Sequence, residues 1–218
     1  MSSGRGSFTS VGRPRLEAGS VMAHGPIPPL GPAYAPRQPM TPPLLEAVRA
    51  RVRDVPDFPR PGIVFKDLTP VLADPLLFHG VVSALAARVA TLEITEVVGI
   101  EARGFILGGA LAATLRRGFV PVRKPGKLPR KAHREAYGLE YGNDALELHV
   151  DALVRNARVL VVDDLLATGG TALATEKLIR RAGGTVVGFV FLCELAYLGG
   201  AERLGSDRVV SLLKYDRP

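Results

Sequence analysis

Two adjacent carboxylates, Asp163 and Asp164, follow a short run of apolar, β-branched residues at 159–162. The segment 168–171 (TGGT) comes shortly after them and is followed by a helical pattern of apolar residues. Glycines let the backbone approach a phosphate closely, threonine hydroxyls can donate to it, and the first N–H groups of a helix favour negative charge. The pattern therefore predicts an anion site between a buried strand and the helix that follows it.

The two carboxylates set the kind of anion that this site would take. They would repel a phosphate, but they accept hydrogen bonds well from hydroxyls and could hold a Mg²⁺ ion through water. A sugar phosphate meets both demands, with its hydroxyls at the carboxylates. Its phosphate would then lie at Ala167, Thr168, Gly169, Gly170 and Thr171.

An ordinary strand, turn and helix with a threonine N-cap is the alternative interpretation of the same residues. It leaves unexplained the two acids at the carboxyl end of an apolar strand, which is where ligands bind in open α/β sheets. A Walker A loop is excluded because no lysine follows the glycines.

Buried strands and helices alternate along most of the chain, which predicts an α/β fold with a central, mostly parallel sheet flanked by helices. Strands are expected at 96–100, 119–122, 159–162, 186–192 and 209–213, and helices at 43–55, 76–89, 105–115 and 171–182. A pair of strands at 137–141 and 145–150 is expected to turn at 142–144.

Residues 1–43 contain nine of the eighteen prolines and show no periodicity, so we expect a disordered tail before a domain at 44–218. The one cysteine, Cys193, lies in an apolar run and is expected to be buried. No apolar stretch is long enough to span a bilayer, and the basic start lacks the apolar region of a secretory signal. We therefore expect a cytoplasmic protein.

The net charge of +7 is concentrated in the tail and in the segment 123–134, which has six Lys and Arg residues among twelve. Nucleic acid is one candidate partner for such a run, but the adjacent anion motif favours a polyphosphate substrate. Arg123 and Lys127 could belong to a mobile loop that closes over it. Arg103 follows the strand at 96–100 and could contact the same polyanion, or simply pair with Glu101 at the surface.

The run VLVVDDLLATGGT resembles the phosphoribosyl pyrophosphate (PRPP) signature of the type I phosphoribosyltransferases. Four further segments, in the expected order between Asp57 and Tyr215, resemble the adenine phosphoribosyltransferase family. FPRPGIVFKDLTPVL is similar to its N-terminal hood and EARGFILGGALA to its first pyrophosphate loop, while RKPGKLPR and YGLEYG are similar to its flexible catalytic loop.

The resemblance implies the type I phosphoribosyltransferase fold, with a small hood within 44–72 and a flexible β loop. It implies transfer of the phosphoribosyl group of PRPP to adenine, which forms AMP and pyrophosphate in purine salvage, with Mg²⁺ as cofactor and a homodimer as the assembly. A phosphoribosyltransferase for another purine, or a PRPP-sensing regulator that binds nucleic acid, is the alternative. The tail shows no helix-turn-helix pattern, which argues against nucleic acid as a partner.

The resemblance also implies roles for individual residues. Glu140 would exchange a proton with adenine, and Arg103 and Lys127 would act with it in catalysis. The peptide between Glu101 and Ala102 is cis in some family members. The residues implied in adenine binding are Val64, Phe65 and Lys66, and those implied in PRPP binding are Arg103, Arg123, Lys127, Tyr141, Asp163, Asp164 and the segment from Ala167 to Thr171.

Overall fold

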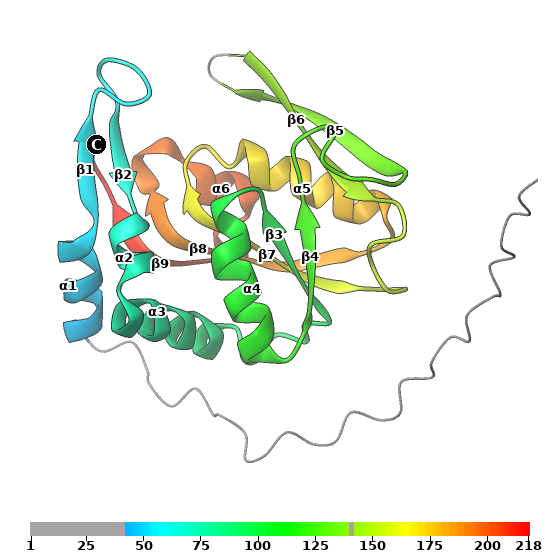
Figure 1. Cartoon of the computed structure of the whole chain (residues 1–218), viewed down its shortest axis with the longest axis horizontal. Helices are drawn as coiled ribbons and strands as arrows, with labels where there is room; N and C mark the ends of the chain where they lie inside the picture. Colours follow the sequence, from blue (N-terminus) through cyan, green and yellow to red (C-terminus); the bar gives the residue numbers. More distant parts are fainter. Residues whose placement is uncertain (1–41, 140–141) are drawn as a thin grey trace, which may run out of the picture. The chain divides into compact units, whose positions relative to one another are not determined.

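The computed structural model describes residues 42–139 and 142–218, and a five-stranded parallel sheet lies at its centre (Figure 1). The strands lie in the order β4-β3-β7-β8-β9, so the predicted parallel sheet is confirmed. Their carboxyl ends meet at one edge of the sheet. The bounds are β3 Glu96–Ile100, β4 Gly118–Val122, β7 Arg158–Leu166, β8 Thr185–Leu195 and β9 Val209–Tyr215.

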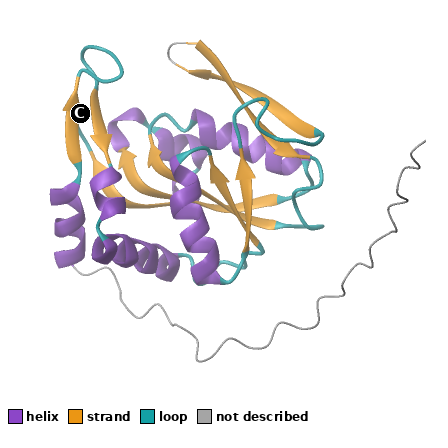
Figure 2. Cartoon of the chain, viewed as in Figure 1, coloured by secondary structure: helices purple, strands orange, loops and turns teal. Residues whose placement is uncertain are grey.

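Strand β7 is buried on both faces, which explains its continuous run of apolar residues. Leu160 and Val162 pack into one core with α3 and α4, and Val159 and Val161 pack into a second core with α5 and α6. The helices thus cover both faces of the sheet (Figure 2). Their bounds are α3 Pro75–Arg88, α4 Arg103–Leu115, α5 Gly170–Arg181 and α6 Gly200–Leu204, and two short 3-10 turns lie at Ala196–Leu198 and Ser206–Arg208.

The hood consists of α1 Pro42–Arg51, β1 Arg53–Pro56, β2 Val64–Asp67 and α2 Thr69–Ala73, with β1 and β2 forming an antiparallel hairpin. The prediction of one helix over 43–55 is wrong beyond Arg51. Val55 precedes a proline, which disfavours helical backbone, and it pairs with Phe65 in the hairpin. Because α1 begins at Pro42, the last two residues of the predicted tail are helical, and the rest of the tail lies outside the described residues.

A second hairpin, β5 Ala132–Leu139 and β6 Gly142–His149, contacts α5. The predicted turn at 142–144 is wrong, because these residues belong to β6 and pair with Tyr137–Leu139. Arg123, directly after β4, exchanges backbone hydrogen bonds of 3.0 and 2.8 Å with Glu147 of β6. The hairpin is therefore attached to the edge of the central sheet.

No helix in the described ranges, 42–139 and 142–218, is long and apolar enough to cross a membrane.

Gly104 marks a close approach between the start of α4 and strand β7. A Cβ atom at Gly104 would lie 2.8 Å from both the Asp163 Oδ1 atom and the Val162 carbonyl oxygen, and 3.1 Å from the Asp163 Cα atom. Two of these atoms are backbone, so they cannot move aside as a flexible side chain can. Only glycine allows α4 to begin this close to the carboxylates.

We predict that Gly104→Ala lowers the free energy of unfolding by about 1–3 kcal/mol, because the added methyl group overpacks this contact. Gly109, in the same helix, is the matched control, since a Cβ atom there meets nothing within 4 Å. Gly109→Ala should stabilise the protein by about 0.5–1 kcal/mol through its effect on the unfolded chain. Urea denaturation of the two variants checks both values, and shifts of the same sign and size would contradict the close-approach argument.

Candidate active site

The predicted anion motif forms a cavity of about 230 Å³ at the junction of β7 and α5. Gly169, with a φ of +77°, makes the turn, and α5 begins at Gly170 without a side-chain cap on its N-terminus. The first amide groups of α5 are thus available to a ligand. The cavity is lined by Arg103, Asp163, Asp164, Leu165, Leu166, Ala167, Thr168, Gly169, Gly170, Thr171, Ala172 and Phe191. We call it the phosphate cavity.

The two carboxylates lie within β7 rather than after it, because the strand continues to Leu166. Asp164 is buried and forms an ion pair with the Arg103 Nε group. Its backbone N–H donates to the Asp163 Oδ1 atom over 2.9 Å. Burial, and next the negative charge of Asp164, raise the pKa of Asp163 well above its ordinary value. Arg103 therefore neutralises Asp164, and Asp163 can accept a proton or a hydrogen bond from a ligand hydroxyl.

A second, more apolar cavity of about 620 Å³ lies between the hood and the carboxyl ends of β7 and β8. We call it the base cavity. It is lined by Pro59, Arg60, Gly62, Ile63, Val64, Phe65, Lys66, Leu165, Ala167, Thr168, Leu195, Tyr197, Leu198 and Pro218. The Phe65 ring packs edge-to-face on Phe58 at 5.2 Å and lies 5.3 Å from the Arg103 guanidinium carbon. An apolar cavity with an aromatic wall suits a planar heterocycle.

The two cavities share Leu165, Ala167 and Thr168. The predicted residues Val64, Phe65 and Lys66 therefore border the same space as the phosphate motif. Sequence reasoning missed one wall of the base cavity, formed by Leu195, Tyr197 and Leu198. The position of this segment directly after a buried parallel strand was the available signal, since ligands bind at such strand ends.

Glu101 holds the loop between β4 and β5, residues 123–131, against the end of β3, and we call this segment the basic loop. Its carboxylate accepts hydrogen bonds from the Lys124 backbone N–H over 2.9 Å and from the Arg123 Nε group over 3.2 Å. The first of these bonds is the main cause that lowers the pKa of Glu101. The alternative pairing of Glu101 with Arg103 is wrong, because Arg103 pairs with Asp164. The peptide between Glu101 and Ala102 is cis.

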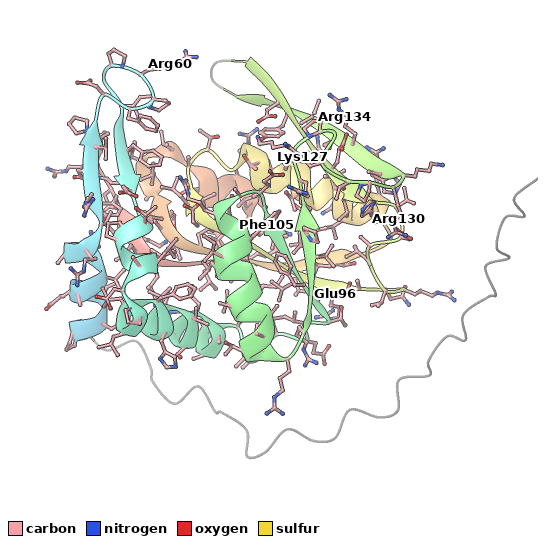
Figure 3. The ribbon with its side chains drawn as sticks, in the orientation of Figure 1. Arg60, Glu96, Phe105, Lys127, Arg130 and Arg134 are labelled. Atoms are coloured by element: carbon pink, nitrogen blue, oxygen red, sulfur yellow. The ribbon has the colours of Figure 1, made fainter. Side chains whose placement is uncertain are left out.

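Arg123 and Lys127 line neither of the two cavities. The Arg123 Nη1 group donates to the Lys127 carbonyl oxygen over 3.1 Å, which folds this part of the loop on itself. Lys127 lies on the loop between β4 and the β5–β6 hairpin, as Figure 3 shows.

Lys124 forms a polar cluster with the hairpin that sequence reasoning did not identify. Its ammonium group pairs with Asp144 and lies 3.2 Å from the Tyr137 hydroxyl oxygen, which in turn donates to Asp144 over 3.2 Å. Burial is the largest single effect and would raise the pKa of Asp144. The hydrogen bonds from Lys124, the Ala145 backbone N–H and Tyr137, together with the charge of Lys124, outweigh it, and the pKa is lowered. The cluster ties the root of the basic loop to the hairpin. Glu140 and Tyr141, two of the predicted site residues, lie outside the described residues.

Mg²⁺ fits the donor set of this site only in company with a phosphate ligand. Within residues 42–139 and 142–218, no three His, Cys, Asp or Glu side chains are grouped to hold a metal ion. Asp163 and Asp164 supply two carboxylates at the phosphate cavity. Mg²⁺ is commonly held by one or two carboxylates together with substrate phosphates, directly or through water. The residues present suit that mode.

Comparison with known proteins agrees with this architecture. The phosphoribosyl transferase domain model matches residues 67–211. An adenine phosphoribosyltransferase of Myxococcus xanthus is 58% identical over 172 residues, which are 79% of this chain and 94% of that protein. The crystal structure of adenine phosphoribosyltransferase from Rhodothermus marinus matches with a TM-score of 0.76 and 53% identity, and the match covers 80% of this chain and 100% of that one.

A third match links the fold to ligands in a relative. The Saccharomyces cerevisiae adenine phosphoribosyltransferase, solved in complex with an imino-altritol bisphosphate and adenine, is 35% identical with a TM-score of 0.73. The match covers 78% of this chain and 99% of that one. Because the family model spans most of the domain and relatives are up to 58% identical, the chain belongs to the phosphoribosyl transferase family, among its adenine phosphoribosyltransferases.

Proposed function

We propose that this protein transfers the phosphoribosyl group of PRPP to adenine, which forms AMP and pyrophosphate in purine salvage. One observation carries the proposal: the phosphate cavity and the base cavity share the wall of Leu165, Ala167 and Thr168. A single nucleotide can therefore place its phosphate in one and its base in the other. The ribose between them would lie against Asp163 and Asp164.

Binding would divide the substrates between the two cavities. The 5-phosphate of PRPP would accept hydrogen bonds from the amide groups and threonine hydroxyls of Ala167–Thr171, and its ribose hydroxyls would donate to Asp163 and Asp164. Adenine would stack on Phe65, with Val64 and Lys66 beside it. The apolar walls of the base cavity would exclude water from the reacting groups.

Cleavage at the anomeric carbon develops positive charge on the ribose and negative charge on the departing pyrophosphate. Asp163 and Asp164 would stabilise the positive charge. Arg103 would stabilise the pyrophosphate from the phosphate cavity, and Arg123 and Lys127 would join it when the basic loop closes. Bound Mg²⁺ would neutralise part of the diphosphate charge, with Asp163 and Asp164 as its ligands through water.

The roles of Glu140 and Tyr141 rest on the family resemblance alone. Glu140 would accept the proton that adenine loses as its ring nitrogen attacks the ribose, and Tyr141 would contact PRPP. A homodimer and a cytoplasmic location complete the proposal, and they too rest on the sequence. Light scattering on the purified protein tests the dimer.

Base selectivity tests the function directly. Pyrophosphate release from PRPP is measured with adenine, guanine, hypoxanthine and xanthine in turn, and we expect release with adenine alone. Release with guanine but not adenine would overturn the base assignment while keeping the reaction. Release with none of them would favour a PRPP-sensing regulator.

We predict that Glu140→Gln lowers kcat by about 10²–10³, the usual loss when one preorganised catalytic group is removed. The amide keeps the size of the side chain but cannot take up the proton. PRPP affinity, measured by calorimetry, should stay close to that of the wild type. Wild-type turnover in this variant would show that the proton acceptor is another group.

Asp163→Asn is predicted to separate stability from activity. The raised pKa of Asp163 means that its ionised form is disfavoured in the folded protein, so the folded state loses stability as pH rises above about 4, the value of the unfolded chain. Asparagine stays neutral, so the variant should melt at a higher temperature than the wild type at pH 7 and at nearly the same temperature near pH 3. Its kcat should fall by about 10²–10³, because a carboxylate is lost beside the ribose.

Thermal melts at the two pH values, with kinetics at pH 7, check this prediction. A variant that is less stable than the wild type at pH 7 would contradict the charge argument.

A further inference from the structure

Phe65 and Lys66 are neighbours on strand β2 and both border the base cavity, but their side chains make different contacts. The Phe65 ring packs beside Arg103, which lines the phosphate cavity. Lys66 is only 4% exposed, and its ammonium group lies 2.9 Å from the Asp54 Oδ1 atom and 4.6 Å from the centroid of the Tyr215 ring. Because side chains alternate along a strand, the position of one of these residues fixes the position of the other.

A second cation of the hood, Arg49, also contacts the Tyr215 ring. The Arg49 guanidinium carbon lies 4.9 Å from the ring centroid, and the Arg49 Nη2 group donates to the Lys214 carbonyl oxygen over 3.2 Å. Arg49 belongs to α1 and Lys66 to β2, whereas Tyr215 ends β9 of the central sheet. We call Arg49, Asp54, Lys66 and Tyr215 the hood anchor.

The hairpin needs such an attachment. Every residue of β1 is exposed, and an isolated two-stranded hairpin is at best marginally stable in water. A buried ammonium group is costly unless it is paired, and here a carboxylate and an aromatic face compensate it. Asp54 pairs with Lys66 within the hairpin, whereas the Tyr215 ring belongs to the central sheet, so the cation–ring contact forms only while β2 lies against β9.

We propose that Lys66 is a positioning residue whose ammonium group, held between Asp54 and the Tyr215 ring, fixes β2 against β9 and thereby keeps Phe65 in the wall of the base cavity. Lys66 would thus act on adenine through the hood rather than by a side-chain contact with the base. This inference rests on the proposed function, because it assigns the base cavity to adenine. Loosening the anchor should weaken adenine binding and leave the phosphate cavity intact.

The test compares KM for adenine with KM for PRPP in anchor variants. Lys66→Met and Tyr215→Leu each remove one side of the cation–ring contact, and each should raise the adenine KM about tenfold, with the PRPP KM within about twofold of wild type. Lys66→Arg keeps a cation that stacks on aromatic rings, and Tyr215→Phe keeps the ring, so both should stay within about threefold of wild type.

Arg158→Met is the matched control, because it removes a cation from an exposed pair with Glu93 at the amino end of β7. It should change neither KM. If Lys66→Met does not fold, Asp54→Asn tests the same pair from its exposed partner, which is 60% accessible, with an expected rise of about threefold.

Phe65→Ala distinguishes a failure of the base-cavity assignment from a failure of the hood anchor. If Phe65→Ala leaves the adenine KM unchanged, the assignment of the base cavity is wrong. If Phe65→Ala raises it but folded Lys66→Met or Asp54→Asn does not, the anchor is wrong. Equal rises in both KM values across the anchor variants would also overturn the proposal, since they would indicate general destabilisation.

Discussion

Two adjacent carboxylates inside a strand that is buried on both faces carry an electrostatic cost, and Arg103, the first residue of α4, offsets part of it. Arg103 pairs with the buried Asp164, while Asp163 keeps a raised pKa. Without the guanidinium group, two negative charges would face each other in a site of low polarity. The ion pair therefore allows two adjacent carboxylates to lie side by side at the carboxyl end of β7.

The same arginine connects the parts of the site. It follows the carboxyl end of β3, lines the phosphate cavity, and lies against Phe65 of the hood. Gly104, the next residue, lets α4 begin in contact with the backbone of β7. On the other side of the cis peptide, Glu101 holds the basic loop through Arg123 and Lys124. The proposed contacts to ribose, base and pyrophosphate would thus converge on four consecutive residues, Glu101–Gly104.

Local patterns in the sequence predicted the phosphate cavity well. The apolar run, the acid pair and the TGGT segment each have a short-range physical reason, so strand, turn and helix followed from residues close together in the chain. The predicted strand ends at residue 162, whereas β7 continues to Leu166. Carboxylates are rarely strand residues unless a partner such as Arg103 compensates their charge. That partner is 61 positions away and became visible only with the strand order.

Long-range partners explain what the sequence did not predict. In the sequence Lys66 is a single cation with no visible partner. Its contact with the Tyr215 ring, at the end of β9, is seen only in the structure. The wall of the base cavity at Leu195–Leu198 carries no chemical signature, because apolar residues there look like any core segment. In the sequence Lys124 is one of several cations of the basic loop, and nothing there indicates its pairing with Asp144 of the hairpin.

A crystal structure with AMP tests the central claim, that one nucleotide spans two cavities joined at Leu165, Ala167 and Thr168. The account predicts the phosphate within hydrogen-bond distance of the amide groups of Ala167–Thr171, the ribose hydroxyls at Asp163 and Asp164, and adenine against Phe65. A nucleotide whose phosphate lies instead at Arg123 and Lys127, or whose base lies outside the hood, would contradict it.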